Sequence, residues 1–227
     1  MLMTDSEILQ AVKEGRICIS PFREEKLQGA SYDLSVGAEA LVSNSDDKVL
    51  LGADRAASVH LNAGDFALVI TRESVKLPMD MACDIGARSS LARRGLMLLA
   101  GMQVDPGFEG HLRFGLFNAS PRRITLDWDD ELCMLEFHKL SGPVSHPAAR
   151  NQDLIDGRIP EQDRSYLRQL ETTSLSELAR NLQSLTKSVE SLAFETRTMA
   201  KGWKVVLAGI IAIFTAVVAA IIINLLK

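Results

Sequence analysis

The sequence predicts a mainly β head over residues 1–147, of the sandwich or barrel class, with one helix at its N-terminus. Short apolar runs such as DFALVI, LRFGLFN and ELCMLEFHKL are separated by Gly, Pro, Asn and Asp, as in strands joined by turns. The opening MLMTDSEILQAVKEGR has the pattern of a capped amphipathic helix and not of an apolar export segment. No helix-length amphipathic pattern follows it within the head. Because the chain has 227 residues and one core takes up to about 150, further segments are expected.

The segment 203–226 is predicted to be a transmembrane helix. Residues 205–226 carry no charged side chain and would form a helix of about 33 Å, enough to cross a bilayer core. Trp203 and Lys204 stand at its near edge, where interfacial anchors are common. A buried core helix is the alternative. We therefore expect a single-pass tail anchor, with the lipid bilayer as a partner and the head on the cytoplasmic side.

A helix over residues 174–200 is expected to form a coiled coil. Its apolar residues alternate spacings of three and four: Leu175, Leu178, Leu182, Leu185, Val189 and Leu192. A single amphipathic helix lying on the head would show the same pattern. The preceding residues 148–173 have the proline, glycine and charge content of a linker or an extended arm.

Charge and cysteine content exclude several classes of function. The net charge of −4 argues against nonspecific nucleic-acid binding, which needs a broad basic surface. The three cysteines are far apart and form no C-x-x-C pair, so neither a disulfide framework nor a zinc site is indicated, and a reducing compartment is expected. His60, His138 and His146 show no metal-ligand spacing.

The stretch GARSSLARRG, residues 86–95, is unusual among these apolar runs. Its serine hydroxyls and backbone N–H groups can bind phosphate oxygens, and its arginines supply positive charge and planar donors. A surface turn with a basic face is the alternative interpretation. In an acidic chain, a basic loop favours a small anionic ligand.

Four motifs in order carry a family resemblance. They are LQGASYDLSVG (27–37), GARSSLARRGL (86–96), VDPGFEGHLRFGLFN (104–118) and LEFHKLSGP (135–143). Together they resemble the dCTP deaminase branch of the trimeric dUTPase superfamily, over about residues 4–143. The resemblance implies a dUTPase-like (β-clip) distorted barrel and a homotrimer that binds deoxynucleotides between its subunits.

The resemblance also implies the site residues. The residues expected to bind phosphate are Arg88, Ser89, Ser90 and Arg93. Those expected to bind the sugar and base are Asp105, Gly107, Phe108, Gly110 and Asn118. In the pyrophosphatase relatives the residue matching Asp105 contacts the sugar and acts as general base on the attacking water, while Mg²⁺ is carried by the triphosphate. An aspartate that only caps its own turn is the alternative.

The chain departs from the family pattern in three places. Family deaminases use a glutamate three residues before the asparagine that matches Asn118, and here that position is Gly115, which cannot move a proton. A strand bulge or a close backbone approach is the other reading of this glycine. The zinc deaminase signature is also absent. Met134 stands near the place of a phosphate-holding glutamine of the pyrophosphatases, and nothing after Pro143 matches their glycine-rich, arginine-bearing C-terminal arm. Arg150 or Arg158 of a neighbouring subunit is the conjectured substitute for that arm.

Two functions follow. The first is a membrane-anchored deoxynucleotide-binding protein, inactive as a deaminase, that acts as a nucleotide sensor or effector. The second is a membrane-tethered dUTPase or dCTP deaminase-type nucleotide hydrolase in pyrimidine deoxynucleotide metabolism. If the chain is an enzyme, retention of Asp105 and the glycine at 115 favour dUTP pyrophosphatase activity over dCTP deamination.

Overall fold

The computed structural model describes residues 1–43, 45, 48–171, 183–189 and 191, and it divides the chain into the units Met1–Ser176 and Glu177–Lys227. In the second unit residues 183–189 are helical, and Leu185 and Val189 are exposed. The rest of the predicted coiled coil and the predicted membrane segment, 203–226, lie outside the described residues. Within the described part of the chain, no helix combines the length and apolar character needed to cross a membrane.

The predicted N-terminal helix is confirmed as α1 (Asp5–Lys13). Thr4 caps the helix through a reciprocal capping box. The Thr4 hydroxyl accepts a hydrogen bond from the Glu7 backbone N–H, and the Glu7 carboxylate accepts one from the Thr4 backbone N–H. Ile8 and Ala11 are buried, so the apolar side of the helix packs on the head.

The predicted mainly β class is also confirmed. The large sheet has the order β7-β9-β5-β2-β11-β6-β8, with β1 beside β5 and β3 beside β2, and its neighbours pair antiparallel. β4 and β10 form a second, two-stranded sheet. The strands are β1 (Cys18–Ser20), β2 (Tyr32–Val42), β3 (Val49–Leu50), β4 (Val59–Leu61), β5 (Phe66–Lys76), β6 (Met81–Ala87), β7 (Leu96–Leu99), β8 (Gln103–Val104), β9 (Glu109–Asn118), β10 (Ile124–Leu126) and β11 (Glu131–Lys139). The remaining helical segments described in the first unit are a 3₁₀ turn, Glu24–Lys26, and α2 (Ser89–Arg93), α3 (Gln152–Ile155) and α4 (Glu161–Glu171).

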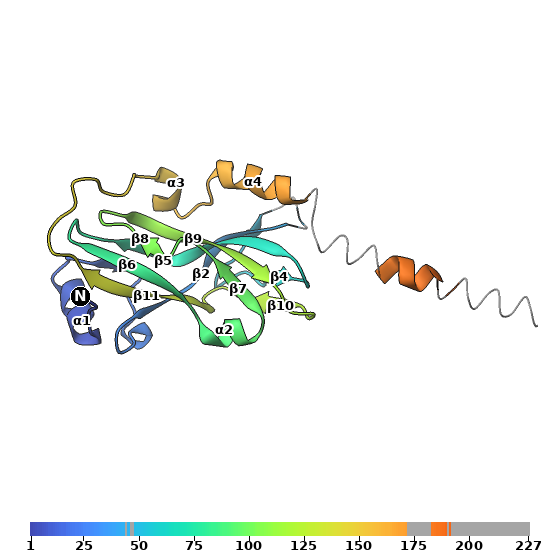
Figure 1. Ribbon diagram of the computed structural model, residues 1–227, viewed down its shortest axis with the longest axis horizontal. Coiled ribbons are helices and arrows are strands. Elements are labelled where there is room, and N and C mark those ends of the chain that lie inside the picture. Colours follow the sequence, from blue (N-terminus) through green and yellow to red (C-terminus); the bar gives the residue numbers. More distant parts are fainter. Residues whose placement is uncertain (44, 46–47, 172–182, 190, 192–227) are drawn as a thin grey trace, which may run out of the picture. The chain divides into compact units, whose positions relative to one another are not determined.

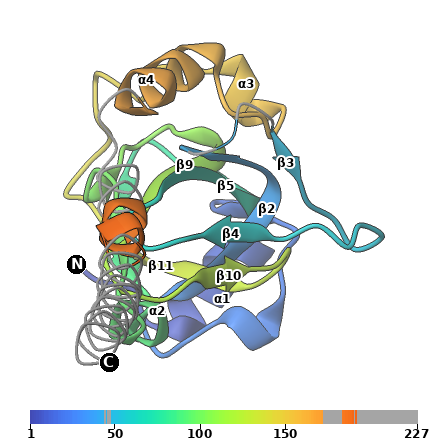
Figure 2. The ribbon, with the colours of Figure 1, turned by 90° about the vertical axis from the view of Figure 1, so that its right-hand side faces the viewer.

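The large sheet curls because β2 is shared by its two halves. The first part of β2 pairs with β11 and the second part with β5, with a register shift after Val36. Gly37 stands at this shift, and a Cβ there would lie 2.5 Å from the carbonyl carbon of Thr71. Only glycine allows so close a backbone approach. Figure 2 looks along the resulting curl, with β9 and β5 above and β11 and β10 below.

Apolar side chains fill two clusters. The main core lies inside the curl, and Tyr32, Phe114 and Phe137 are among its largest fully buried members. The second cluster joins Leu41 and Ile70 of the sheet to three residues of the C-terminal region, Leu154, Ile159 and Leu167. Figure 1 shows α3 and α4 lying over β9 and β5. Residues 148–173, expected to be a linker or an arm, therefore contain two helices, and these cover the outer face of the sheet.

An ion network joins the loop before β2 to β5 and to the turn before β11. Arg23 contacts Glu73 at 3.2 Å and Asp129 at 2.7 Å, and Arg72 contacts Asp129 at 2.6 Å while stacking over the Trp128 ring. Partial burial acts to raise the pKa of Asp129, but hydrogen bonds from Arg23 and Arg72 outweigh it and hold the pKa well below its ordinary value. Asp129 also adopts a left-handed backbone with φ of 71°.

We expect Asp129→Asn to lower the free energy of unfolding by about 1–3 kcal/mol at neutral pH, because it removes one charge from a partly buried network. Since the folded-state pKa of Asp129 is depressed, its contribution is present above the unfolded pKa of about 4 and is lost as the pH falls further. The difference between variant and wild type should therefore shrink in acid. Urea unfolding between neutral pH and about pH 3 measures it, with exposed Asp54→Asn as control. A pH-independent difference would contradict the assignment.

Candidate functional site

The arginine and serine motif forms the short helix α2, directly after β6. Leu91 anchors it by burial, and Gly95, with φ of 85°, ends it against Ser120. The side chains of Ser89, Ser90 and Arg93 are exposed, and Arg93 donates to the Ser89 hydroxyl at 3.3 Å. These three side chains are therefore presented together on the surface.

Arg88, just before α2, is held within the chain. Its guanidinium donates to Asp33, which is fully buried, and to Glu131, which is half exposed. Burial raises the pKa of Asp33, although the charge of Arg88 opposes that rise. Arg88 thus ties the start of α2 to β2 and β11, and phosphate binding by this residue stays a prediction.

The second predicted group lies in the turn between β8 and β9. Asp105 is exposed, and its carboxylate accepts a hydrogen bond of 3.1 Å from the Gln103 amide. Gly107 has φ of 78°, a conformation that favours glycine. Phe108 is partly buried, and its carbonyl accepts from the Leu77 N–H at 2.9 Å, which fixes the turn on the sheet. Asp105 is therefore a solvent-facing carboxylate on a rigid turn.

Asn118 lies inside the molecule, at the end of β9. Its amide donates to the carbonyls of Leu61 and Arg122, and its oxygen accepts from the backbone N–H and hydroxyl of Ser120. The side chain is fully buried. In this structure Asn118 fixes the connection from β9 to β10, and its contact with sugar or base stays a prediction.

One chain does not bring the two predicted groups together. Val104 pairs with Cys83, so Asp105 lies toward Ala82 at the start of β6. Arg88 follows Ala82 by six residues, which is roughly 20 Å along an extended strand. Figure 1 agrees, since β8 lies at the upper left and α2 on the lower side.

Gly115 lies in the middle of β9, between Leu68 of β5 and Leu99 of β7. A Cβ on Gly115 would lie 2.9 Å from the Phe66 ring and 3.1 Å from the Leu99 carbonyl oxygen. This position therefore has no side chain and, with Phe66 in place, no room for one. The pairing puts Leu68 and Gly115 on the same face, which is the outer face that α3 and α4 cover.

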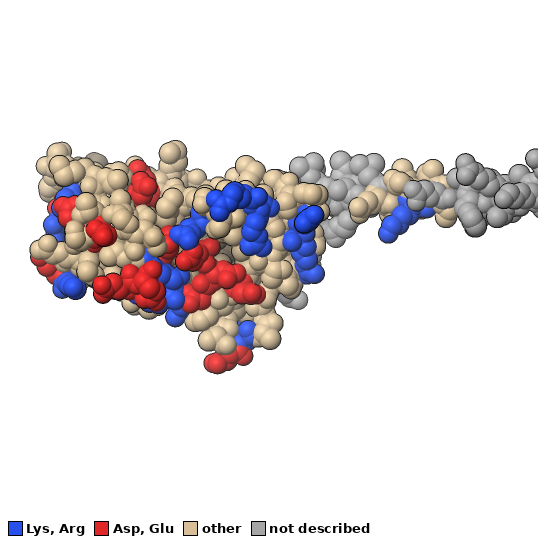
Figure 3. Space-filling view, turned by 90° about the horizontal axis from the view of Figure 1, so that it is seen from below, with Lys and Arg blue, Asp and Glu red and all other residues tan. Residues whose placement is uncertain are grey.

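Four exposed arginines surround the end of α2. Arg93 and Arg94 close this helix, and Arg122 and Arg123 follow β9. A hydrogen bond of 2.9 Å from the Ala119 N–H to the Gly95 carbonyl links the two segments. In Figure 3 basic side chains gather toward one end of the lower face, with acidic side chains beside them. This arrangement gives a locally positive surface on an acidic chain.

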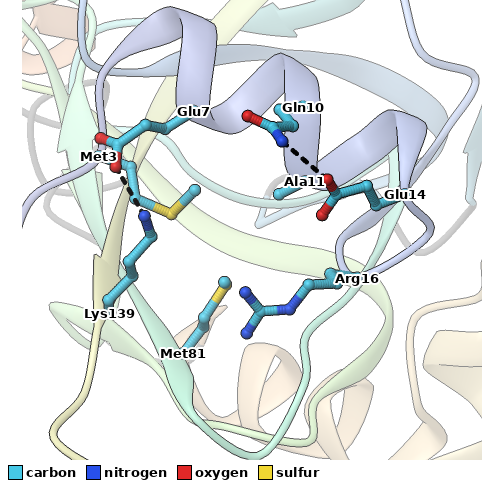
Figure 4. A pocket seen from close by; sticks show the side chains of 8 residues that line it. All are labelled: Met3, Glu7, Gln10, Ala11, Glu14, Arg16, Met81 and Lys139. Carbon is cyan, nitrogen blue, oxygen red and sulfur yellow. Dashed lines mark hydrogen bonds and ion pairs between the residues drawn. The ribbon is translucent and has the colours of Figure 1, made fainter.

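A cavity of about 170 Å³ lies elsewhere, beside α1. Figure 4 shows its lining of Met3, Glu7, Gln10, Ala11, Glu14, Arg16, Met81 and Lys139. Its polar groups already have partners: Glu7 pairs with Lys139 at 2.6 Å, Gln10 donates to Glu14 at 2.8 Å, and Arg16 pairs with Asp80 at 2.7 Å. None of the predicted site residues lines it, so it is not the predicted nucleotide site.

No group of three or more His, Cys, Asp or Glu side chains suited to a metal ion occurs among the described residues. The exposed Asp105 carboxylate is an oxygen ligand of the kind that Mg²⁺ accepts. It fits a metal ion that arrives with a triphosphate, which stays a prediction.

Comparison with known proteins defines first the fold and then the family. A dCTP deaminase structure from Agrobacterium tumefaciens aligns with a TM-score of 0.50 at 20% identity, over 60% of this chain and 48% of that chain, and shows the same fold. The profile described as dCTP deaminase-like matches residues 2–140. This chain therefore belongs to the dCTP deaminase-like family.

Sequence relatives agree with this assignment. The dCTP deaminase of Thermococcus kodakarensis is 41% identical over 135 residues, which cover 60% of this chain and 84% of that protein. The dCTP deaminase of Pyrococcus horikoshii is 38% identical over 151 residues, covering 66% of this chain and 90% of that protein. The similarity thus extends over the head and most of each relative.

Sequence reasoning missed the residues that lie between β9 and the C-terminal helices. Arg113 pairs with Asp163 of α4 at 2.5 Å, and His111 contacts the Thr71 carbonyl at 2.8 Å through Nδ1. A signal was present, because Pro160 followed by Glu161 is a common start of a helix. The sequence did not indicate which surface that helix would cover.

We expect Gly115→Ala to lower the free energy of unfolding by about 1–3 kcal/mol, because the added methyl group overlaps the Phe66 ring. The cost should be smaller in a Phe66→Leu background, where the ring is gone. Gly101→Ala is the control, since a Cβ at Gly101 meets no atom within 4 Å. Urea unfolding of the single and double variants measures the coupling, and equal costs in both backgrounds would contradict this packing.

Proposed function

We propose that the chain binds a pyrimidine deoxynucleoside triphosphate at a site shared between two copies of a homotrimer. The observation that carries the proposal is the separation of α2 from the Asp105 turn, roughly 20 Å within one chain although both present exposed polar groups. In a trimer, Ser89, Ser90 and Arg93 of one copy would hold the phosphates. The turn of another copy would contact the sugar and base.

The retained carboxylate favours hydrolysis of the triphosphate. Asp105 would take a proton from a water molecule whose oxygen attacks the α-phosphorus, and pyrophosphate would leave with its charge balanced by Mg²⁺ and Arg93. The products of dUTP would be dUMP and pyrophosphate. Support comes from family membership and from the exposure of Asp105 on a rigid turn. On this proposal the chain would be an enzyme of pyrimidine deoxynucleotide metabolism.

Deamination is not part of this proposal, because the family's proton-transfer position is Gly115 and Phe66 fills the adjacent space. The same observation favours a second candidate, a nucleotide sensor that binds without turnover. In both cases we propose four parts: a head over 1–147, an arm over 148–173, a coiled coil over 174–200 and a membrane anchor over 203–226. The head would then lie on the cytoplasmic side of the bilayer.

We expect Asp105→Asn to reduce pyrophosphate release from dUTP by about 100-fold or more, because general base catalysis contributes at least that much. Its effect on stability should be small, since Asp105 is exposed. The full chain in mild detergent with Mg²⁺ is assayed with dUTP and dCTP for both pyrophosphate and ammonia. Glu109→Gln, on the same hairpin, is the matched control. Saturable binding without either product would exclude the enzyme and favour the sensor.

Mixing inactive variants tests whether the site is shared. Arg93→Ala combined with Ser89→Ala should abolish binding, and so should loss of the Asp105 turn. If each site takes α2 and the turn from different copies, co-expression of the α2 double variant with Asp105→Asn should restore part of the activity. No recovery in mixed trimers would contradict a shared site. Binding unchanged by the α2 double variant would contradict both candidate functions.

A further inference from the structure

The segment that follows the head lies across the outer face of β5 and β9. We call residues 147–167 the strap. Leu154, Ile159 and Leu167 are its buried residues, with exposed fractions of 8%, 3% and 3%. They pack with Leu41 and Ile70 of the sheet, so the strap is fixed by apolar burial along its length.

The strap also covers the predicted sugar and base surface. The Ala148 N–H donates to the Pro106 carbonyl at 2.9 Å. A Cβ built on Gly107 would lie 2.7 Å from Pro147, and one on Gly110 would lie 3.0 Å from the Leu154 carbonyl. Both glycines are therefore in van der Waals contact with the strap, and a nucleoside cannot occupy the same space.

One ion pair connects the far part of the strap to β9. Arg113 contacts Asp163 of α4 at 2.5 Å, and Asp163 is largely buried while Arg113 is partly exposed. Arg113 stands two residues before Gly115 on the same face of the strand. Gly115, the position that the resemblance matches to the family's proton-transfer residue, therefore lies next to the point where the strap is tied to β9.

We propose that the strap is an autoinhibitory segment that must leave the Asp105 turn and β9 before a nucleoside can bind there. The inference rests on the proposed nucleotide site. It adds that binding competes with the docking of the chain's own strap. Since α4 ends at Glu171, three residues before the predicted coiled coil begins, release of the strap would also free the segment that leads into it.

The test weakens the strap without touching the predicted site. Asp163→Asn removes the ion pair at nearly constant volume, and Leu167→Ala removes apolar contact. If only the released state binds, apparent affinity rises with the population of that state. We expect each variant to bind an Mg²⁺ complex of dUTP with a nitrogen bridge between its α- and β-phosphates about 3- to 10-fold more tightly than wild type. Asp156→Asn is the matched control, because Asp156 pairs with Arg158 inside the strap at 2.5 Å.

Hydrogen exchange on the full chain in detergent separates the outcomes. The ligand should increase exchange in residues 147–167 while it protects the turn at 105–110. Equal affinity in all variants, with the strap protected on binding, would overturn the inference and leave the proposed site intact. If the combined Asp163→Asn and Leu167→Ala variant shows a released strap but binds no dUTP or dCTP analogue, the proposed function is wrong. In that case the strap is not an autoinhibitory segment for nucleotide binding either.

Discussion

The burial of both faces of β5 is the constraint on which the rest of the head depends. Ala67, Val69 and Val75 face the main core, whereas Phe66 and Ile70 face outward. A strand with two apolar faces needs a cover on each side. Here the curl of the sheet supplies one cover and the C-terminal strap supplies the other. Each large apolar side chain of the strap contributes roughly 2 kcal/mol to the stability of the fold by its burial. The strap therefore stabilises the folded chain.

Local chemistry explains what could be predicted of this fold. The capping box of Thr4 and Glu7 lies within four residues, and it specifies α1 without any tertiary contact. Alternating strands and their turns are equally local signals. The path of the strap is different, because Leu154 and Leu167 find their partners on β2 and β5, about a hundred residues earlier in the chain. No periodicity within residues 148–173 encodes that surface.

The candidate site divides in the same way. The motifs located α2 and the Asp105 turn, because each is a continuous segment whose glycines and polar residues are recognisable in order. The partners of Arg88 were not predictable, since Asp33 and Glu131 lie 55 and 43 residues away and meet only where β2 and β11 pair. The buried role of Asn118 likewise depends on Leu61, which the sheet brings beside it.

Gly115 and the strap lie on the same outer face of the sheet. A glutamate at this position would place a carboxylate on the outer face, next to the Phe66 ring, and burying that charge without a partner would be costly. Glycine removes the charge and lets Phe66 fill the space, which completes an apolar surface for the strap. Gly115, which the resemblance places where the family carries its proton-transfer group, thus also favours the docked strap. If nucleotides bind at the proposed site, a segment docked against Gly107 and Gly110 occupies space that the nucleoside needs, and this is the physical basis for proposing that binding competes with the docking of the strap.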